Sequence, residues 1–181
     1  MTPKGGRPTP VLPTSISEGL TYVHLETDAS LNERRTQPAE DGSPLRFAGG
    51  GIVLRNIAMR PVRHEAVPLG FVRSATEAEC LALLAGIRMA RELGASTVRA
   101  RSDLVHLVEA LNGRGTLRSL NLGGVGDQLS EEIRKLRAFQ ILWTSSHHGR
   151  TRGDGVPSAD FLARLAAGLN TRSATRRRHF L

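Results

Sequence analysis

The chain has 181 residues, of which 39% are apolar and 23% are charged, as in globular domains rather than disordered chains. Its one cysteine, Cys80, excludes a disulfide framework and a zinc site built from several cysteines. No stretch approaches the roughly 18 apolar residues of a membrane span, and residues 1–17 lack the apolar core of a secretory signal. We therefore expect a cytoplasmic protein with no membrane partner.

Lysine and arginine outnumber aspartate and glutamate by 25 to 17, which gives a net charge of +8. The excess is uneven, because residues 171–181 contain several arginines and no acid. A basic chain favours a polyanionic partner. The same charge would also serve solubility alone, so charge by itself leaves both interpretations open.

The first part of the domain shows the pattern of strands. Apolar and polar residues alternate from Tyr22 to Thr27, as in a half-buried strand. The polar residues 32–44 include two prolines and predict a loop. Residues 47–55 and 62–72 predict a second and a third strand, the third with a break at Pro68. Three strands this close in sequence predict an antiparallel meander.

Helices and strands alternate in the rest of the chain. Ser74 and Glu77 have the spacing of a capping box, so a helix is expected to begin there and to end before Gly94. The later predicted elements are strand 97–102, helix 104–111, a glycine-rich loop 113–126, helix 131–137, strand 139–144, a polar loop 147–157 and helix 158–169.

This order predicts an α/β fold with a five-stranded mixed sheet flanked by helices. The antiparallel meander would be extended by parallel strands through helical crossovers. We expect residues 20–170 to form one domain. Residues 1–19, rich in proline and glycine, would be a flexible leader, and residues 171–181 a basic tail.

Four acids are expected to meet at one edge of this sheet. Asp28 and Asp103 follow predicted strands, while Glu79 and Asp160 lie near the starts of predicted helices. Four carboxylates at one place repel one another strongly unless divalent cations lie among them. Oxygen ligands favour Mg²⁺ or Mn²⁺ over zinc. Two such ions about 4 Å apart would suit phosphodiester hydrolysis.

Each acid also has a simpler interpretation. Glu77, at capping-box spacing from Ser74, is assigned to the helix start. Glu79 could be an acid that merely suits the positive end of its helix, and Asp103 and Asp160 could each be an N-cap. Taken one at a time, these structural roles are the commoner ones. The four acids taken as a set favour a site.

Four segments resemble the type-I ribonucleases H, over about residues 21–169. They are Leu25–Ser30, Ala78–Ile87, Ser102-Asp103 and Ala159–Ala166, in the order and on the elements that the family uses. The resemblance implies a ribonuclease H-like fold in which Asp28, Glu79, Asp103 and Asp160 bind two Mg²⁺ or Mn²⁺ ions, with Asp28 bridging both.

The implied activity is endonucleolytic cleavage of the RNA strand of RNA–DNA hybrids by a monomeric enzyme. Two other hypotheses stay open. The fold could serve as a nucleic-acid-binding or scaffold module with weak or no catalysis, or as a nuclease for another duplex such as double-stranded RNA.

The family usually has a catalytic histidine in the loop before its last helix. His147 follows Trp143 by four residues, which suits the family's spacing, so we assign His147 to the catalytic set. The longer loop also makes His148 possible. Two solvated loop histidines are the simpler alternative.

The chain departs from the family where hybrids are recognised. Two asparagines of the family's helix motif are Ala75 and Thr76 here, and a glutamine after the strand-end aspartate is Val105. Residues 31–35 replace a glycine–asparagine type of loop, and residues 113–126 are too short for a basic insertion. Strictness of hybrid recognition therefore stays open. Phosphate contacts would come from arginines: Arg34, Arg35, Arg150, Arg152 and those of the tail.

Overall fold

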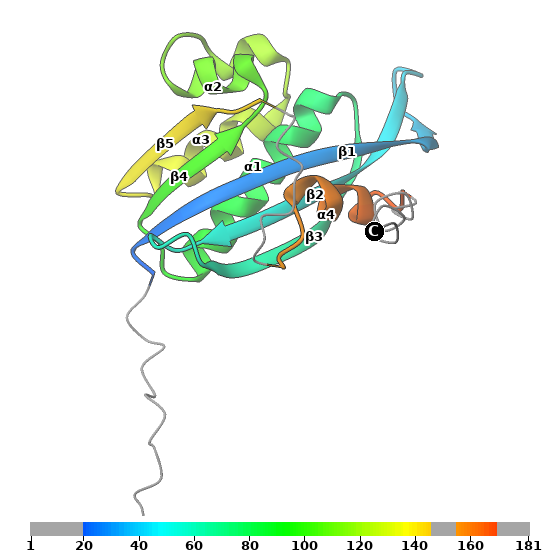
Figure 1. Cartoon of the computed structure of the whole chain (residues 1–181). Coiled ribbons are helices and arrows are strands. Elements are labelled where there is room, and N and C mark those ends of the chain that lie inside the picture. Colours follow the sequence, from blue (N-terminus) through cyan, green and yellow to red (C-terminus); the bar gives the residue numbers. More distant parts are fainter. Residues whose placement is uncertain (1–19, 146–154, 170–181) are drawn as a thin grey trace, which may run out of the picture.

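The computed structural model describes residues 20–145 and 155–169, which contain a five-stranded sheet with the strand order β3-β2-β1-β4-β5 (Figure 1). β2 pairs antiparallel with β1 and β3, whereas β4 pairs parallel with β1 and β5. The predicted mixed sheet, a meander extended by parallel strands, is confirmed. The strands are β1 (Tyr22–Pro38), β2 (Pro44–Arg55), β3 (Pro61–Val72), β4 (Thr97–Ser102) and β5 (Ala138–Trp143).

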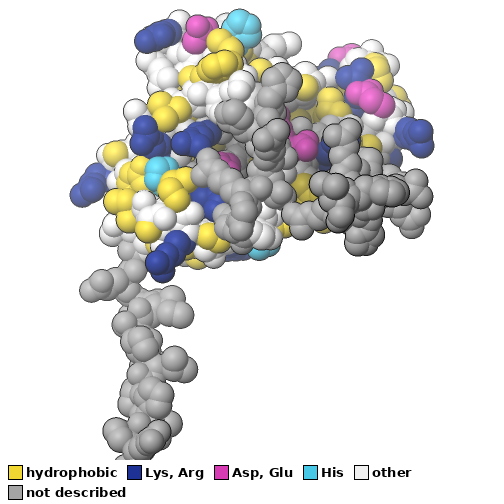
Figure 2. Space-filling view, viewed as in Figure 1, with side chains coloured by type: hydrophobic (Ala, Val, Ile, Leu, Met, Phe, Trp, Pro, Cys, Tyr) yellow, Lys and Arg dark blue, Asp and Glu magenta, His cyan; other side chains and the backbone are white. Residues whose placement is uncertain are grey.

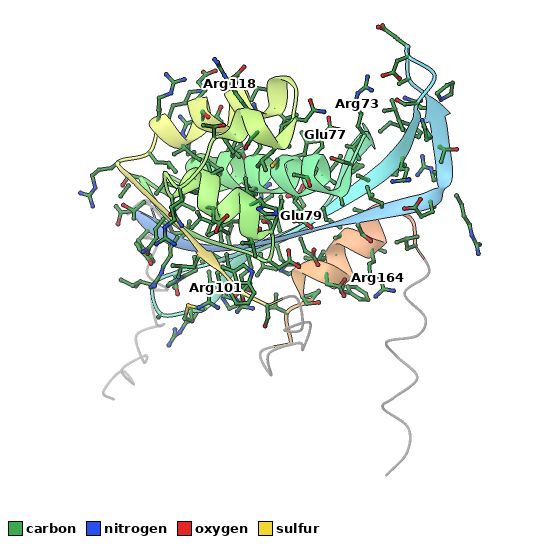
Figure 3. All side chains as sticks on the ribbon, turned by 90° about the horizontal axis from the view of Figure 1, so that it is seen from above. Arg73, Glu77, Glu79, Arg101, Arg118 and Arg164 are labelled. Atoms are coloured by element: carbon green, nitrogen blue, oxygen red, sulfur yellow. The ribbon has the colours of Figure 1, made fainter. Side chains whose placement is uncertain are left out.

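The helices cover both faces of the sheet. α1 packs against β1, β2 and α3 on one face, and α4 packs against β1, β2 and β3 on the other (Figures 1 and 3). No helix in the described ranges is long and apolar enough to cross a membrane. The helices are α1 (Ala75–Glu92), α2 (Val105–Leu111), the 3-10 helix η1 (Leu117–Leu120), α3 (Gly124–Arg134) and α4 (Ala159–Ala166).

Both ends of α1 follow the prediction. The Ser74 side chain accepts a hydrogen bond from the Glu77 backbone N–H at 3.1 Å, as an N-cap residue does. The Glu77 carboxylate accepts the N–H of Arg73 rather than that of Ser74, at 2.7 Å. Gly94 ends the helix with φ +87°, a conformation that glycine adopts without strain.

The main core lies between α1 and the sheet. It is built from large aliphatic side chains that are almost completely buried. Removing this much apolar surface from water is the main stabilising contribution of a fold of this size. The largest of these side chains are Leu25, Ile52 and Leu54 from the strands and Leu83, Leu84 and Ile87 from α1.

Two predicted loops are wrong. Residues 32–38 belong to β1, which stays paired with β2 as far as Pro38. Residues 33–37 are polar and exposed, and contacts across the hairpin hold them. Glu33 pairs with Arg46 at 2.8 Å, and the Arg35 guanidinium lies 3.7 Å from the Phe47 ring centre.

The second wrong loop is 113–126, which contains η1 and the first turn of α3. α3 begins at Gly124 although Gly123 offers no side-chain cap. Tertiary contacts explain this start, because Leu129 is buried in the core and Glu132 pairs with Arg91 of α1 at 2.6 Å.

Candidate active site

Asp28 lies where β4 stops pairing with β1. The parallel ladder between the two strands ends at Glu26 and Arg101, whereas β1 continues along β2, with Asp28 opposite Gly51. The next backbone N–H, that of Ala29, donates to Asp28 Oδ1 at 2.9 Å and to Glu79 Oε1 at 3.0 Å. One amide therefore holds two carboxylates together.

Glu79 reaches this point from the opposite face of the sheet. It lies in the second turn of α1, and its side chain points to β1, whereas the labelled Glu77 lies nearer Arg73 (Figure 3). Glu77 thus serves the helix start, as predicted. Glu79 caps nothing, and its hydrogen bond joins residues 50 positions apart.

Burial and mutual repulsion act on both carboxyl groups. Burial, followed by the charges of Asp160 and Asp103, raises the pKa of Asp28 to about 6. Burial, followed by the charge of Asp28, raises the pKa of Glu79 to about 9. A proton shared in the hydrogen bond between Glu79 and Asp28 relieves part of this repulsion. The four predicted acids are therefore neighbours in space.

Asp103 and Asp160 are free of the capping roles considered above. Leu104 occupies the N-cap position of α2, without a side-chain cap, so Asp103 caps nothing there. Ser158 caps α4 by accepting the N–H of Phe161 at 3.2 Å, which leaves the Asp160 carboxylate available. Arg164, one turn later on α4, lies 3.9 Å from the Asp160 carboxylate.

Glycines in β2 set the position of Asp160. A Cβ atom on Gly51 would collide with the carbonyl oxygen of Ala159, and one on Gly49 with the backbone of Ala167. α4 therefore rests directly on the β2 backbone, next to Asp28. The buried Asn32 side chain fastens the far end of the helix by donating to the Ala167 carbonyl oxygen at 2.9 Å.

The donor set suits a hard divalent cation. All four side chains offer carboxylate oxygens, the ligands that Mg²⁺ and Mn²⁺ prefer. Within the described ranges, no three His, Cys, Asp or Glu side chains lie close enough together to hold an ion as they stand. The chemistry of the donors and the repulsion between them fit such an ion, and the side chains would have to turn inward to bind it.

Other predicted site residues lie elsewhere. Arg34 and Arg35 are exposed on β1, six and seven residues beyond Asp28, which is about 20 Å or more along a strand. Arg35 is engaged with Phe47. The structure does not bring these arginines to the acids. The remaining candidates lie outside the described residues: His147, His148, Arg150 and Arg152.

Several residues that support the site were not predicted. Gly49 and Gly51 lie within the predicted strand 47–55, and nothing in that strand's pattern indicates that a helix rests on them. Arg164 is placed by helical spacing from Asp160. The exposed Trp143 indole N–H donates to the Asp103 carbonyl oxygen at 3.2 Å and fixes the backbone beside that acid.

Comparison with known proteins agrees with this arrangement. Residues 42–150 match the family described as reverse transcriptase-like, a segment that includes Glu79 and Asp103. None of the curated proteins compared with the chain matches it.

Solved structures of ribonucleases H share its fold. Ribonuclease H1 of Halobacterium salinarum NRC-1 is 19% identical, with TM-score 0.64, over 81% of this chain and 98% of its own. The N-terminal ribonuclease H domain of Rv2228c from Mycobacterium tuberculosis, solved as a fusion with maltose-binding protein, is 21% identical. Its TM-score is 0.65, over 86% of this chain and 99% of its own.

A third structure contains a nucleic acid. LC11 ribonuclease H1, isolated from compost by a metagenomic approach, was solved in complex with an RNA/DNA hybrid. It is 14% identical, with TM-score 0.63, over 81% of this chain and 96% of its own. Since the family match spans more than half of the chain and the structural matches share its architecture, this protein belongs to the reverse transcriptase-like family and has the ribonuclease H fold.

Proposed function

We propose that the protein is a metal-dependent endonuclease that hydrolyses the RNA strand of RNA–DNA hybrids. The observation that carries the proposal is a group of four acids that repel one another, two of which, Asp28 and Glu79, are largely buried and share the Ala29 N–H. Such an arrangement lowers stability and is typical of functional sites. The ribonuclease H fold and the family membership support the choice of substrate class.

The four acids would hold the divalent cations. Two Mg²⁺ or Mn²⁺ ions, when bound, supply charge stabilisation for the scissile phosphate and a more acidic water. Water would add to phosphorus as the bond to the 3′ oxygen breaks, which leaves a 5′-phosphate and a 3′-hydroxyl. Asp28 would help to hold both ions, which is consistent with the effect of each of the other three acids on the pKa of its carboxyl group.

The chain's own groups orient the site before substrate arrives. The Ala29 N–H binds one oxygen each of Asp28 and Glu79 and so keeps these two carboxylates side by side. Trp143 holds the Asp103 backbone, and the glycine contact of β2 holds the first turn of α4 with Asp160. His147 is proposed to assist late proton or product steps.

The direct test uses labelled RNA–DNA hybrid, double-stranded RNA and double-stranded DNA, each with Mg²⁺, Mn²⁺ or excess chelator. We expect cleavage of the RNA strand of the hybrid only when a divalent cation is present. Full activity in chelator would contradict the metal requirement. If double-stranded RNA is cleaved as fast as the hybrid, the protein is a nuclease with a broader specificity for duplexes.

A second candidate is a hybrid-binding module with weak catalysis. The observation that favours it is the loss of polar groups along the substrate side of the helices, at Ala75, Thr76 and Val105, of which Ala75 and Val105 are exposed. Contacts to 2′-hydroxyls and base edges in the shallow minor groove would then be fewer. Saturable binding of hybrid without cleavage in either metal would favour this module.

A further inference from the structure

One half of the sheet face that carries α4 has no helix on it in the described ranges. Among the described helices, α4 packs on β1, β2 and β3, and none packs on β4, β5 and the start of β1 on this side (Figure 1). We call this surface the open face and define it by Tyr22, His24, Arg99, Arg101 and Gln140. Strand register places all five side chains on the side of Asp28, since they lie at even steps from it or pair with residues that do.

A row of hydrogen-bond donors crosses the open face. Arg55, His24, Arg99 and Gln140 lie opposite one another on β2, β1, β4 and β5. The row contains no acid, and basic side chains are spread over this part of the surface (Figure 2). In the neighbouring row, Arg101 lies opposite Glu26, the acid of this face, and the two side chains form a long ion pair at 3.9 Å.

Arg99 points to a missing partner. Its Nε atom is buried and has no hydrogen-bond partner in the part of the chain that the structure describes. A buried donor left without an acceptor lowers stability by about 1–3 kcal/mol, so such groups are uncommon in folded proteins. A bound acceptor of negative charge, such as a phosphate oxygen, would satisfy it.

Two rings accompany these donors. Tyr22 and His24 pack edge to face, with ring centres 5.0 Å apart and planes at 78°. Both are half-buried and not covered by a helix. Aromatic rings beside arginines are the usual means by which a sheet binds unpaired bases together with their phosphates.

The open face is continuous with the candidate active site. His24 precedes Asp28 by four residues on β1, and Arg99 precedes Asp103 by four residues on β4 and its end. Four residues of strand span about 13 Å, which is roughly four nucleotides at a rise of 3.4 Å. Figure 3 places Arg101 on the same side of the sheet as Arg164 of α4.

We propose that the open face binds single-stranded nucleic acid, namely an unpaired extension of the strand that occupies the candidate active site. Arg99 and Arg101 contact its phosphates, and Tyr22 and His24 contact its bases. A single strand fits better than a duplex, because its unpaired bases are free to stack on the two rings. The proposal rests on the proposed function, which supplies the strand.

The test compares two labelled hybrids on the full chain in excess chelator, where binding is measured without cleavage. One hybrid is blunt and the other carries a single-stranded extension. We expect the extended hybrid to bind about tenfold more tightly, the effect of roughly one stacked base. The plot of log affinity against log salt should be steeper for it by about 0.7 for each added phosphate contact.

Variants locate the effect. Arg99→Gln and Tyr22→Leu should each remove most of the preference for the extension and leave affinity for the blunt hybrid unchanged. The matched control is Arg114→Gln, which removes one exposed arginine from the turn after α2, away from the open face. It should keep the preference. If Arg99→Gln shows no thermal unfolding transition and is therefore not folded, the binding preference of Tyr22→Leu alone tests the proposal.

Equal affinity for the two hybrids, or a preference that survives both variants, would overturn the proposal. A dimer seen by sedimentation that is lost in Arg99→Gln would also overturn it, because a second copy of the chain would then occupy the surface. A chain that prefers the extension but cleaves no hybrid in either metal would contradict the proposed function alone. A chain that cleaves hybrid without this preference would contradict only the inference about the open face.

Discussion

The two faces of the sheet are built by opposite means. On the α1 side, large aliphatic side chains from strands and helix fill the space between them, and Gly86 brings α1 close to Leu25. On the α4 side, Gly49 and Gly51 provide no side chains, and the helix backbone rests on the strand backbone. The first face is held by a large apolar core, and the second by close backbone contact beside a small apolar cluster of Val53, Val156 and Leu162.

This difference explains where chemistry can be placed. A face filled by leucines has no room for charged groups, because burying them without partners is unfavourable. A short helix packed tightly on glycines leaves the adjoining strand positions free for polar side chains, which here include Asp28 and, further along, Arg99. Glu79 is the exception, since it comes from the apolar side and passes the end of the β4 ladder to reach Ala29.

The largest expected effect concerns the acids themselves. Asp103→Asn should lower cleavage of hybrid by about 100- to 1,000-fold, the range found when one charge-stabilising group is removed. The fold should be unaffected, because the Asp103 side chain caps nothing and only its backbone is held by Trp143. Steady-state cleavage and thermal unfolding of the same preparation measure both quantities. Wild-type turnover by this variant would contradict the assignment of the four acids.

The glycine contact predicts a matched pair of variants. Gly51→Ala places a methyl group against the Ala159 carbonyl oxygen and should lower the free energy of unfolding by about 3 kcal/mol. Gly50→Ala faces the α1 side, where the new methyl meets the flexible Leu69 side chain at 3.2 Å and Ala82 Cβ at 3.3 Å. It should change stability by less than about 1 kcal/mol.

Denaturant titration measures both variants, and cleavage assays show whether Asp160 has moved. We expect Gly51→Ala to lose activity even under conditions where it is fully folded, and Gly50→Ala to keep it. Equal stability of the two variants would mean that the β2 glycines do not set the position of α4.

The sequence predicts most of the fold because its signals are local. The N-cap at Ser74, the stop at Gly94 and the alternation after Tyr22 each act within a few residues, and each is found in the structure. The polar end of β1 was missed because its strand character comes from pairing with β2. The start of α3 was missed because buried contacts of Leu129, not a cap, fix it.

The site was predictable to a smaller extent. Residue types at strand ends and helix starts singled out the acids, and the structure brings them together. What could not be predicted is how they are held. Three contacts hold them, and each joins positions far apart in sequence. They are the Ala29 amide shared by two acids, the packing of α4 on the β2 glycines, and the hydrogen bond from Trp143 to the Asp103 backbone. No periodicity or motif encodes such contacts.

The loop histidine gives a smaller effect than the acids. His147 lies outside the described residues, so this prediction comes from its spacing to Trp143. His147→Ala should slow turnover by about 100-fold, as for an acid–base group, and leave hybrid affinity unchanged. His148→Ala is the matched control. If His148→Ala is the damaging change, the spacing assignment is wrong, and if neither variant is slower, both histidines are merely solvated.

The smallest expected effect is on stability. It tests whether burial and mutual repulsion make the ionised acids unfavourable in the folded protein. The pKa of Glu79 is raised in the folded chain to about 9 from an ordinary value of 4.5, and that of Asp28 to about 6 from 3.8. Between these values the folded chain binds more protons than the unfolded chain. In the metal-free protein, the contribution of these two groups to the free energy of unfolding should therefore be highest near pH 4 and should fall as the pH rises to 9.

Glu79→Gln removes this ionisation and keeps a side chain that can donate to Asp28. Without metal it should be more stable than wild type by about 1–2 kcal/mol at pH 7, with a flatter pH dependence. Glu77→Gln, two residues earlier, should instead lose a little stability, because the carboxylate of Glu77 accepts the Arg73 N–H.

Thermal unfolding from pH 4 to 9, with chelator or with Mg²⁺, measures these differences. Mg²⁺ should stabilise wild type more than Glu79→Gln, since a cation favours the charged carboxylates. If Glu79→Gln is less stable than wild type at every pH, Glu79 stabilises the fold. Its carboxylate would then not be a group that lowers stability until a cation binds.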